Sequence, residues 1–273
     1  MSDEEIIINY IDKLLPFITD LRRIGDKRIA KENSPKKLFM LFSMQEASNS
    51  FLVFRDLFIR ALKDPSFFTQ LSVIARNIHE IFLTFFWVRK ENIEELYFAY
   101  SLKEDFEFLE LYDEITGHTG KHPFADAEIR NKIIVGKKYY SDLLSKTKTS
   151  NSFIKTEAKG ADRLFPSWDH IAERVEYLYK EGFFASMKLG HKNYYRLVSL
   201  ATHFRPSSVT ANIPTISAPE ATSTSKKVIS QITIILMLLL TEEITNRLAY
   251  GVKYKKQLKT LTDDYNNTIA KLF

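Results

Sequence analysis

The chain has 273 residues, 45% of them apolar, which is enough to bury the core of one large helical domain or two small ones. It contains no cysteine, so disulfides and thiolate-bound metal or redox chemistry are excluded, and a reducing cytoplasmic setting fits. Its net charge of +5 is modest for this length and does not by itself require a nucleic-acid partner.

Three helices are predicted in the N-terminal third of the chain. Only 8 Gly and 8 Pro residues interrupt long stretches with apolar residues at helical spacing, so we predict an all-α fold. The first amphipathic helix covers residues 3–25 with a kink at Pro16, and a charged turn that contains Gly25 follows it. A second helix is predicted over about residues 36–62 and a third over about 65–90.

The third of these helices is strongly apolar but carries four polar residues in its middle. They are Arg76, Asn77, His79 and Glu80. Polar side chains rarely lie unpaired inside a core, and residues four apart share one helix face. We therefore predict that Arg76 and Glu80 can pair with each other, and that either can reach groups on a facing helix.

The middle of the chain is predicted to be more peripheral. A charged helix covers about residues 91–115 and another about 126–145, and the loop between them contains His118 and His122. No second pair of ligands with suitable spacing follows these two histidines, so we expect no metal site. Residues 146–167 are rich in Lys, Thr, Ser and Asn and are predicted to be a flexible connection.

Three more helices are predicted in the C-terminal part. The first ends near Gly182, and after a short break the second bears Arg196 and must stop at Pro206. Residues 206–225 lack apolar periodicity and are predicted to be a flexible surface loop. The last helix runs over about residues 226–259 or beyond.

The most apolar run, residues 228–240, predicts a buried central helix and not a membrane span. As a helix it is only about 20 Å long, against the roughly 30 Å of a bilayer core. The acidic N-terminal residues 1–5 lack the basic start and the cleavage site of a signal peptide. We therefore expect a cytoplasmic protein that does not contact a membrane.

Positive charge is concentrated near the C-terminus. From Lys226 onward, eight Lys or Arg residues stand against four Asp or Glu residues, which accounts for +4 of the net +5. The main basic cluster of the last helix consists of Lys253, Lys255, Lys256 and Lys259. A solvated helix face and a nucleic-acid contact are both compatible with this cluster.

A polar stripe is predicted on the helix that ends before Pro206. Arg196 and His203 are seven residues apart, and seven residues at about 100° each fall about 20° short of two helical turns, so both lie on one face. Asn193 and Ser199 lie on the same face. An arginine binds phosphate oxygens with a permanent charge and a histidine can move a proton near neutral pH, so the pair suits phosphate chemistry.

The sequence lacks the short motifs of most common enzyme classes. It contains no G-x-x-x-x-G-K-[ST] or G-x-G-x-x-G phosphate loop, no H-E-x-x-H, no G-x-S-x-G and no repeated E-x-x-H pair. We therefore expect no cofactor. The residues left as candidates for chemistry are the Arg196/His203 stripe and the Arg76/Glu80 pair.

These residues resemble the R-x(4–6)-H pattern of the HEPN superfamily, all-α proteins many of which are metal-independent ribonucleases of toxin–antitoxin and phage-defence systems. Residues 70–210 also resemble a family of uncharacterised bacterial helical proteins. That family has a Y-R-x-x-S-x-x-x-H segment, here Tyr195 to His203, and an upstream helix with an arginine and a glutamate, here Arg76 and Glu80. The resemblance implies a HEPN-like helical bundle with peripheral helices.

The resemblance also implies a mechanism and a partner. HEPN ribonucleases pair two protomers around a shared cleft, so the chain would be a homodimer that acts on RNA or binds a nucleotide. Arg196 would hold the scissile phosphate, His203 would be the general acid or base, and Ser199 would assist by hydrogen bonding. One position departs from the pattern, because many active members have a polar residue where this chain has Leu197.

A structural role for the same residues is the alternative. Arg196, Ser199, His203, Arg76 and Glu80 would then form a buried polar network that fixes helix packing. The chain would be a non-catalytic helical module that binds a cognate protein partner through exposed aromatics such as Phe183, Phe184 and Tyr194. In either case we predict one helical domain over residues 1–273, with the motif-bearing core at about 36–260.

Overall fold

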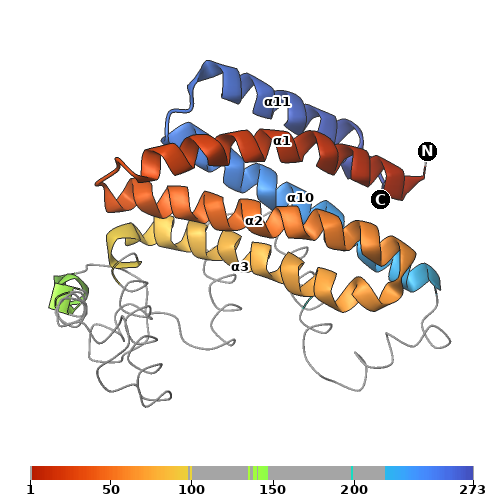
Figure 1. Ribbon diagram of the computed structural model, residues 1–273, viewed down its shortest axis with the longest axis horizontal. Helices are drawn as coiled ribbons and strands as arrows, with labels where there is room; N and C mark the ends of the chain where they lie inside the picture. Colours follow the sequence, from red (N-terminus) through yellow and green to blue (C-terminus); the bar gives the residue numbers. More distant parts are fainter. Residues whose placement is uncertain are drawn as a thin grey trace, which may run out of the picture. The chain divides into compact units, whose positions relative to one another are not determined.

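The protein is predominantly helical, as predicted (Figure 1). The computed structural model describes residues 2–97, 99, 135, 138–139, 141–146, 198 and 219–272, with side chains described from residue 224 in the last range. These residues contain no strand. The helices within them are α1 (Asp3–Ile29), α2 (Pro35–Lys63), the 3-10 turn η1 (Pro65–Phe67), α3 (Phe68–Glu91), α10 (Pro219–Arg247), α11 (Gly251–Asn267) and the 3-10 turn η4 (Ile269–Lys271).

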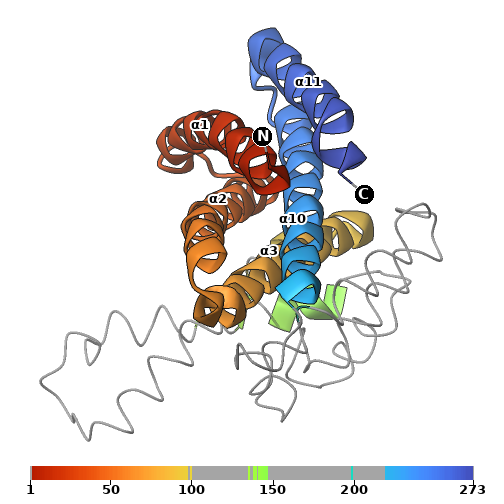
Figure 2. The same ribbon diagram turned by 90° about the vertical axis from the view of Figure 1, so that its right-hand side faces the viewer.

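The chain divides into two compact units. Unit 1 comprises Met1–Asn33, Met40–Phe85 and Ile171–Phe273, and unit 2 comprises Ser34–Phe39 and Phe86–His170. Unit 1 therefore contains α1, α10 and α11 with most of α2 and α3. Within it, α10 packs against both α1 and α11 (Figure 2).

Helix α1 begins and ends with favourable charges. The Ser2 side chain accepts a hydrogen bond from the Glu5 amide, and the Glu5 carboxylate accepts one from the Ser2 amide, which is a capping box. Its first turn is acidic and its last turn is basic, as the helix dipole favours. The helix continues through Pro16.

The predicted end of α1 near Gly25 is wrong, because the helix continues to Ile29 with Gly25 buried inside it. A Cβ atom at Gly25 would lie 3.3 Å from Leu41 Cδ2 and 3.4 Å from the Tyr250 hydroxyl. Glycine therefore serves here for close packing of α1 against two other segments and not as a turn residue.

Helices α2 and α3 have nearly the predicted boundaries. Asp64 separates them, and its carboxylate accepts a hydrogen bond from the Ser66 amide at the start of η1. In α2, the rings of Phe51, Phe54 and Phe58 stack in series and are fully buried. This aromatic row forms a continuous part of the core of unit 1.

Helix α10 is the buried central helix that the apolar run predicted. Its fully buried residues include Ile229, Ile234, Leu236, Met237 and Leu240. The helix begins at Pro219, so the predicted loop over residues 206–225 is wrong in its last seven residues. Proline fits the first turn of a helix because its missing N–H has no partner there in any case.

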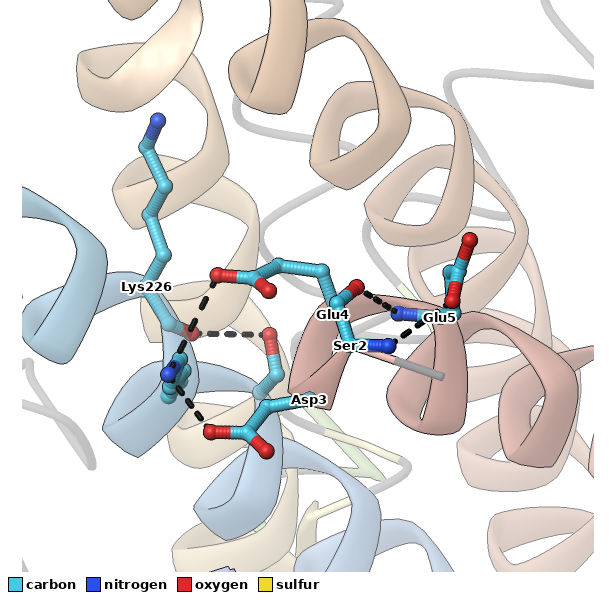
Figure 3. Close-up of polar contacts among 7 residues, drawn as sticks. Ser2, Asp3, Glu4, Glu5 and Lys226 are labelled. Atoms are coloured by element: carbon cyan, nitrogen blue, oxygen red, sulfur yellow. Dashed lines mark hydrogen bonds and ion pairs between the residues drawn. The ribbon is translucent and has the colours of Figure 1, made fainter.

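Two lysines in the N-terminal half of α10 connect this helix to α2 and α1. Lys226 is buried and donates a hydrogen bond to the Ala61 carbonyl in the last turn of α2, where helix carbonyls lack helical partners. Burial lowers the pKa of Lys226. Lys227 pairs with Asp3 at 2.6 Å, which holds α10 to the first turn of α1. Figure 3 shows the Asp3 and Glu4 side chains of that turn pointing toward α10.

The predicted single C-terminal helix is wrong, because it is divided into α10 and α11 at residues 248–250. Ala249 and Gly251 have φ angles of 51° and 82°, and such left-handed residues cannot continue an α-helix. Tyr250 lies buried at this corner, with the Arg28 guanidinium 4.6 Å from its ring centroid.

Unit 2 is described mainly where α3 ends. Asn92 has a φ angle of 55° and turns the chain, and helical backbone resumes at Glu94. Across this turn Arg89 pairs with the buried Glu94 at 2.7 Å. The Phe39 and Tyr97 rings meet edge to face, with centroids 5.1 Å apart.

Two helical segments, Pro65–Glu91 and Thr224–Arg247, are long and apolar enough to cross a membrane by length and composition alone. The apolar run 228–240 is only part of the second segment, so the helix is longer than the run itself. About two thirds of each apolar stretch is buried inside the structure, as in the core helices of soluble proteins.

The aromatic row of α2 predicts that substitutions at two neighbouring positions differ strongly in their effect on the free energy of unfolding. Phe54→Ala should lower the free energy of unfolding by about 3–5 kcal/mol, because it removes a fully buried ring. Leu52, on the same helix, is 46% exposed, so Leu52→Ala should cost less than about 1 kcal/mol. Urea unfolding of both variants measures the difference, and equal losses would contradict this assignment of the buried face.

A buried tyrosine at the end of α11 predicts a loss of stability at alkaline pH. Burial raises the pKa of Tyr265 to about 12. The folded protein therefore holds this proton more tightly than the unfolded chain, whose tyrosine pKa is about 10, so the stabilisation is present below about pH 10 and is lost toward pH 12. Unfolding free energies measured across this range should fall less steeply for Tyr265→Phe, and parallel pH profiles would contradict the raised pKa.

Candidate functional site

The middle of α3 carries three ionisable side chains, Arg76, His79 and Glu80, of which Arg76 and His79 are buried. Arg76 Nε donates to Glu80 Oε1 at 2.7 Å, which is the predicted pair at spacing i, i+4. The Arg76 side chain is 9% exposed, the Glu80 side chain is 32% exposed, and His79 is fully buried. The carboxylate thus reaches solvent while the arginine lies within the protein.

Helix α3 holds this cluster in place on both sides. Apolar residues on its other faces, among them Ile78, Phe82 and Phe85, are fully buried in the core. Asn77 Nδ2 donates to Ser50 Oγ on α2 at 2.9 Å. Because the helix is anchored along its length, the orientation of Arg76 is set by its backbone and by Glu80 together.

His79 belongs to the cluster although it was not among the predicted site residues. The sequence shows it in the middle of the apolar helix, and it is three residues from Arg76, a spacing that brings two side chains to one face. That spacing was the sequence signal that could have added His79 to the predicted site residues. His79 thus adds a fully buried polar side chain to the part of α3 that bears the ion pair.

The predicted Arg196/His203 stripe lies outside the described residues, and so do its other members, Asn193 and Ser199. Val198, between them in sequence, is described as helical and fully buried. Of the predicted site residues, the structure therefore brings together Arg76 and Glu80. The contact between this pair and the stripe stays a prediction.

The four predicted lysines lie on α11 in unit 1, and all are exposed. They are Lys253, Lys255, Lys256 and Lys259. Lys253 Nζ lies 5.7 Å from the Tyr254 ring centroid, a cation–π distance. Among the residues that the structure describes, none of these lysines forms an ion pair with a carboxylate.

No group of three or more His, Asp or Glu side chains that could hold a metal ion occurs within the described ranges. His118 and His122, the two histidines closest in sequence, lie outside these ranges. The chemistry that the described side chains can supply is therefore charge pairing between Arg76 and Glu80 on α3, and anion attraction at α11.

The protein is thus an all-α protein with an Arg76–Glu80 ion pair and a buried histidine on α3 and a separate cluster of exposed lysines on α11. Residues 56–215, more than half of the chain, match a family described as a family of unknown function (DUF5677), and the chain belongs to this family. The matched range contains α3 and the Arg196/His203 segment. No curated protein and no solved structure matches the chain significantly.

The Arg76/Glu80 pair predicts a measurable coupling energy. A double-mutant cycle with Arg76→Met and Glu80→Gln should give about 1–2 kcal/mol, because the arginine is buried and the glutamate is only partly screened by solvent. Arg247 and Glu243 on α10 form a matched control with the same i, i+4 spacing at 2.9 Å, but the arginine side chain is 57% exposed.

The control pair should couple by only about 0.3–0.5 kcal/mol. Chemical denaturation of the two sets of variants measures both energies. Equal coupling in the two cycles would show that burial does not strengthen the Arg76/Glu80 pair.

Proposed function

We propose that this protein is a HEPN-like, RNA-targeting or nucleotide-binding protein of a bacterial defence or stress system, and that it acts as a metal-independent endoribonuclease. One observation carries the proposal. The Arg196-x(6)-His203 motif follows, in the same chain, a central helix in which Arg76 and Glu80 form the predicted ion pair. The spacing of the motif suits a phosphate clamp and a proton-transfer group on one helix face.

The proposed reaction is the cleavage of an RNA phosphodiester bond. Neutral His203 takes the proton of a ribose 2′-hydroxyl, and the 2′ oxygen forms a bond to the adjacent phosphorus. The bond from phosphorus to the 5′ oxygen breaks, and this oxygen takes a proton from a second, protonated imidazole. Arg196 compensates the negative charge that develops on the phosphate oxygens.

A homodimer would supply the second imidazole from the other copy of His203. The products of the balanced reaction are a 2′,3′-cyclic phosphate and a 5′-hydroxyl end. Neither step requires a metal ion. Ser199 and Asn193, on the same predicted helix face, would donate hydrogen bonds to the phosphate.

The described residue within the motif segment supports an accessible site. If the predicted helix forms, Val198 lies about 200° around its axis from Arg196, and the two would occupy opposite faces. Val198 is fully buried. A helix that packs against the protein through Val198 would direct Arg196 and His203 away from that contact.

A second candidate function is a non-catalytic protein-interaction module. The burial of Arg76 and His79 within α3 favours it, because removing one member of a buried charged cluster costs several kcal/mol and a structural role alone explains the cluster. The departure at Leu197 also favours it. The aromatic residues Phe183, Phe184 and Tyr194, which would form its interaction surface, lie outside the described residues.

Cleavage of a mixed pool of small RNAs in EDTA tests the proposal. The wild-type protein should cleave and leave 2′,3′-cyclic phosphate ends, which mass spectrometry detects. His203→Ala should lose roughly 10²–10⁴-fold in rate, the usual contribution of general acid–base catalysis. His118→Ala is the matched control, because it makes the same change at a histidine without an assigned role, and it should cleave like the wild type.

Circular dichroism and thermal unfolding establish that each variant is folded. Equal cleavage by His203→Ala and the wild type would remove His203 from the mechanism. No cleavage by the folded wild type, together with a large loss of stability in His203→Ala, would support the structural role instead.

A further inference from the structure

The outer face of α11 carries lysines that form no ion pair with any described carboxylate. Successive residues turn by about 100°, so Lys255, Lys259 and Lys256 span an arc of about 100° centred on the exposed Val252. The buried Leu258 and Tyr265 lie on the opposite side of the helix. The lysines therefore face solvent over the first three turns of α11.

The order of charges along α11 opposes the stability of the helix itself. The four lysines lie in the N-terminal part, and Asp263 and Asp264 lie near the C-terminal end. The helix dipole favours the reverse order of charges in the first and last turns. Because α1 in the same chain has the favourable order, the lysines of α11 are not explained by helix stabilisation.

Two acidic side chains near α11 are engaged by α1 or by α11 itself, while the exposed Asp263, four residues after Lys259 on the outer face, offsets only part of the lysine charge. Lys13 pairs with Asp264 at 2.9 Å, and Asp20 accepts a hydrogen bond from the Tyr254 hydroxyl at 3.0 Å and pairs with Arg23 at 2.6 Å. These carboxylates are therefore drawn away from the outward lysines. A positive potential is left on the outer face.

The lysine face continues into an open groove between α1 and α11. The groove has a volume of about 1200 Å³, and its lining includes Gln257 and Thr260 together with Lys13, Arg23 and the carboxylates that pair with them, Asp264 and Asp20. On the helix, Lys253 lies about 20° from Thr260, at the groove edge. Side-chain donors from both helices thus border one continuous surface.

We propose that this surface, the outer face of α11 together with the edge of the α1–α11 groove, binds the phosphate backbone of RNA. The choice of RNA rests on the proposed function. The charge complementarity rests on the exposed lysines alone. Lysines bind phosphates as point charges without reading bases, so the surface holds RNA without sequence preference.

An anionic membrane surface is the competing partner for a basic helix. Helices that lie in a membrane interface bury an apolar face among the lipids. The apolar face of α11 packs inside the protein. Val252 is the only exposed large hydrophobic residue of this helix, and 83% of the surface of Val252 is accessible. The outer face therefore has the charge for polyanion binding but little apolar surface for insertion.

Fluorescence anisotropy with a labelled 2′-O-methyl oligouridylate, which the proposed ribonuclease cannot cleave, tests the proposal over about 50–200 mM KCl, where phosphate contacts show their salt dependence. The test variant is K255Q/K256Q/K259Q. The control variant, K63Q/K138Q/K271Q, removes the same charge from three exposed lysines outside the lysine face. Both should fold, and removing charge that opposes the α11 dipole should not lower the unfolding midpoint of the test variant.

The test variant should bind at least about 10-fold more weakly at low salt, and the slope of log K against log salt should decrease by about 2, which is three phosphate contacts at roughly 0.7 each. The control variant should change affinity by less than about twofold, since its lysines make no phosphate contact. Equal affinity of both variants and the wild type would overturn the proposal. Binding to phosphatidylserine vesicles that depends on these lysines, with no binding to RNA, would also overturn it.

The cleavage assay separates this result from the fate of the ribonuclease proposal. Lysine-dependent RNA binding without cleavage would establish the surface and reject the endoribonuclease. If cleavage depends on His203, and both cleavage and RNA binding are unchanged in K255Q/K256Q/K259Q, the surface is rejected and the ribonuclease proposal is retained.

Discussion

The packing of Tyr250 against α1 determines the direction of the whole C-terminal helix. Its hydroxyl donates to the Leu21 carbonyl at 3.4 Å, and it fits there because Gly25 has no side chain. Arg28 lies over the ring and also donates to the Leu248 carbonyl at 2.7 Å, which satisfies a carbonyl at the end of α10. One corner therefore both ends α10 and directs α11 back along α1.

That direction decides which charges of α11 reach solvent. The Tyr10 hydroxyl donates to the Leu261 carbonyl at 2.7 Å, and its ring meets Tyr265 edge to face. With its apolar side held against α1 and α10, the helix can only present its lysines outward. Exposure of this basic cluster is thus a consequence of packing, and the unfavourable order of its charges points to a role outside folding.

The sequence predicted those features that depend on local spacing. Apolar periodicity and Pro65 located α2 and α3, and the i, i+4 spacing located the Arg76/Glu80 pair. Gly25 and the corner at Tyr250 were missed because both depend on contacts between residues more than two hundred positions apart. Local propensity cannot show that a glycine inside a helix makes room for a tyrosine from another segment.

The two candidate sites respond differently to salt, which gives a physical way to separate their roles. Exposed lysines act through solvent, where charges are screened over about 8–10 Å at physiological ionic strength. Arg76 is buried and paired, so its interaction with Glu80 is screened much less. A function that weakens steeply with added salt therefore depends on α11, whereas one that persists depends on the buried cluster of α3 or on groups that it orients.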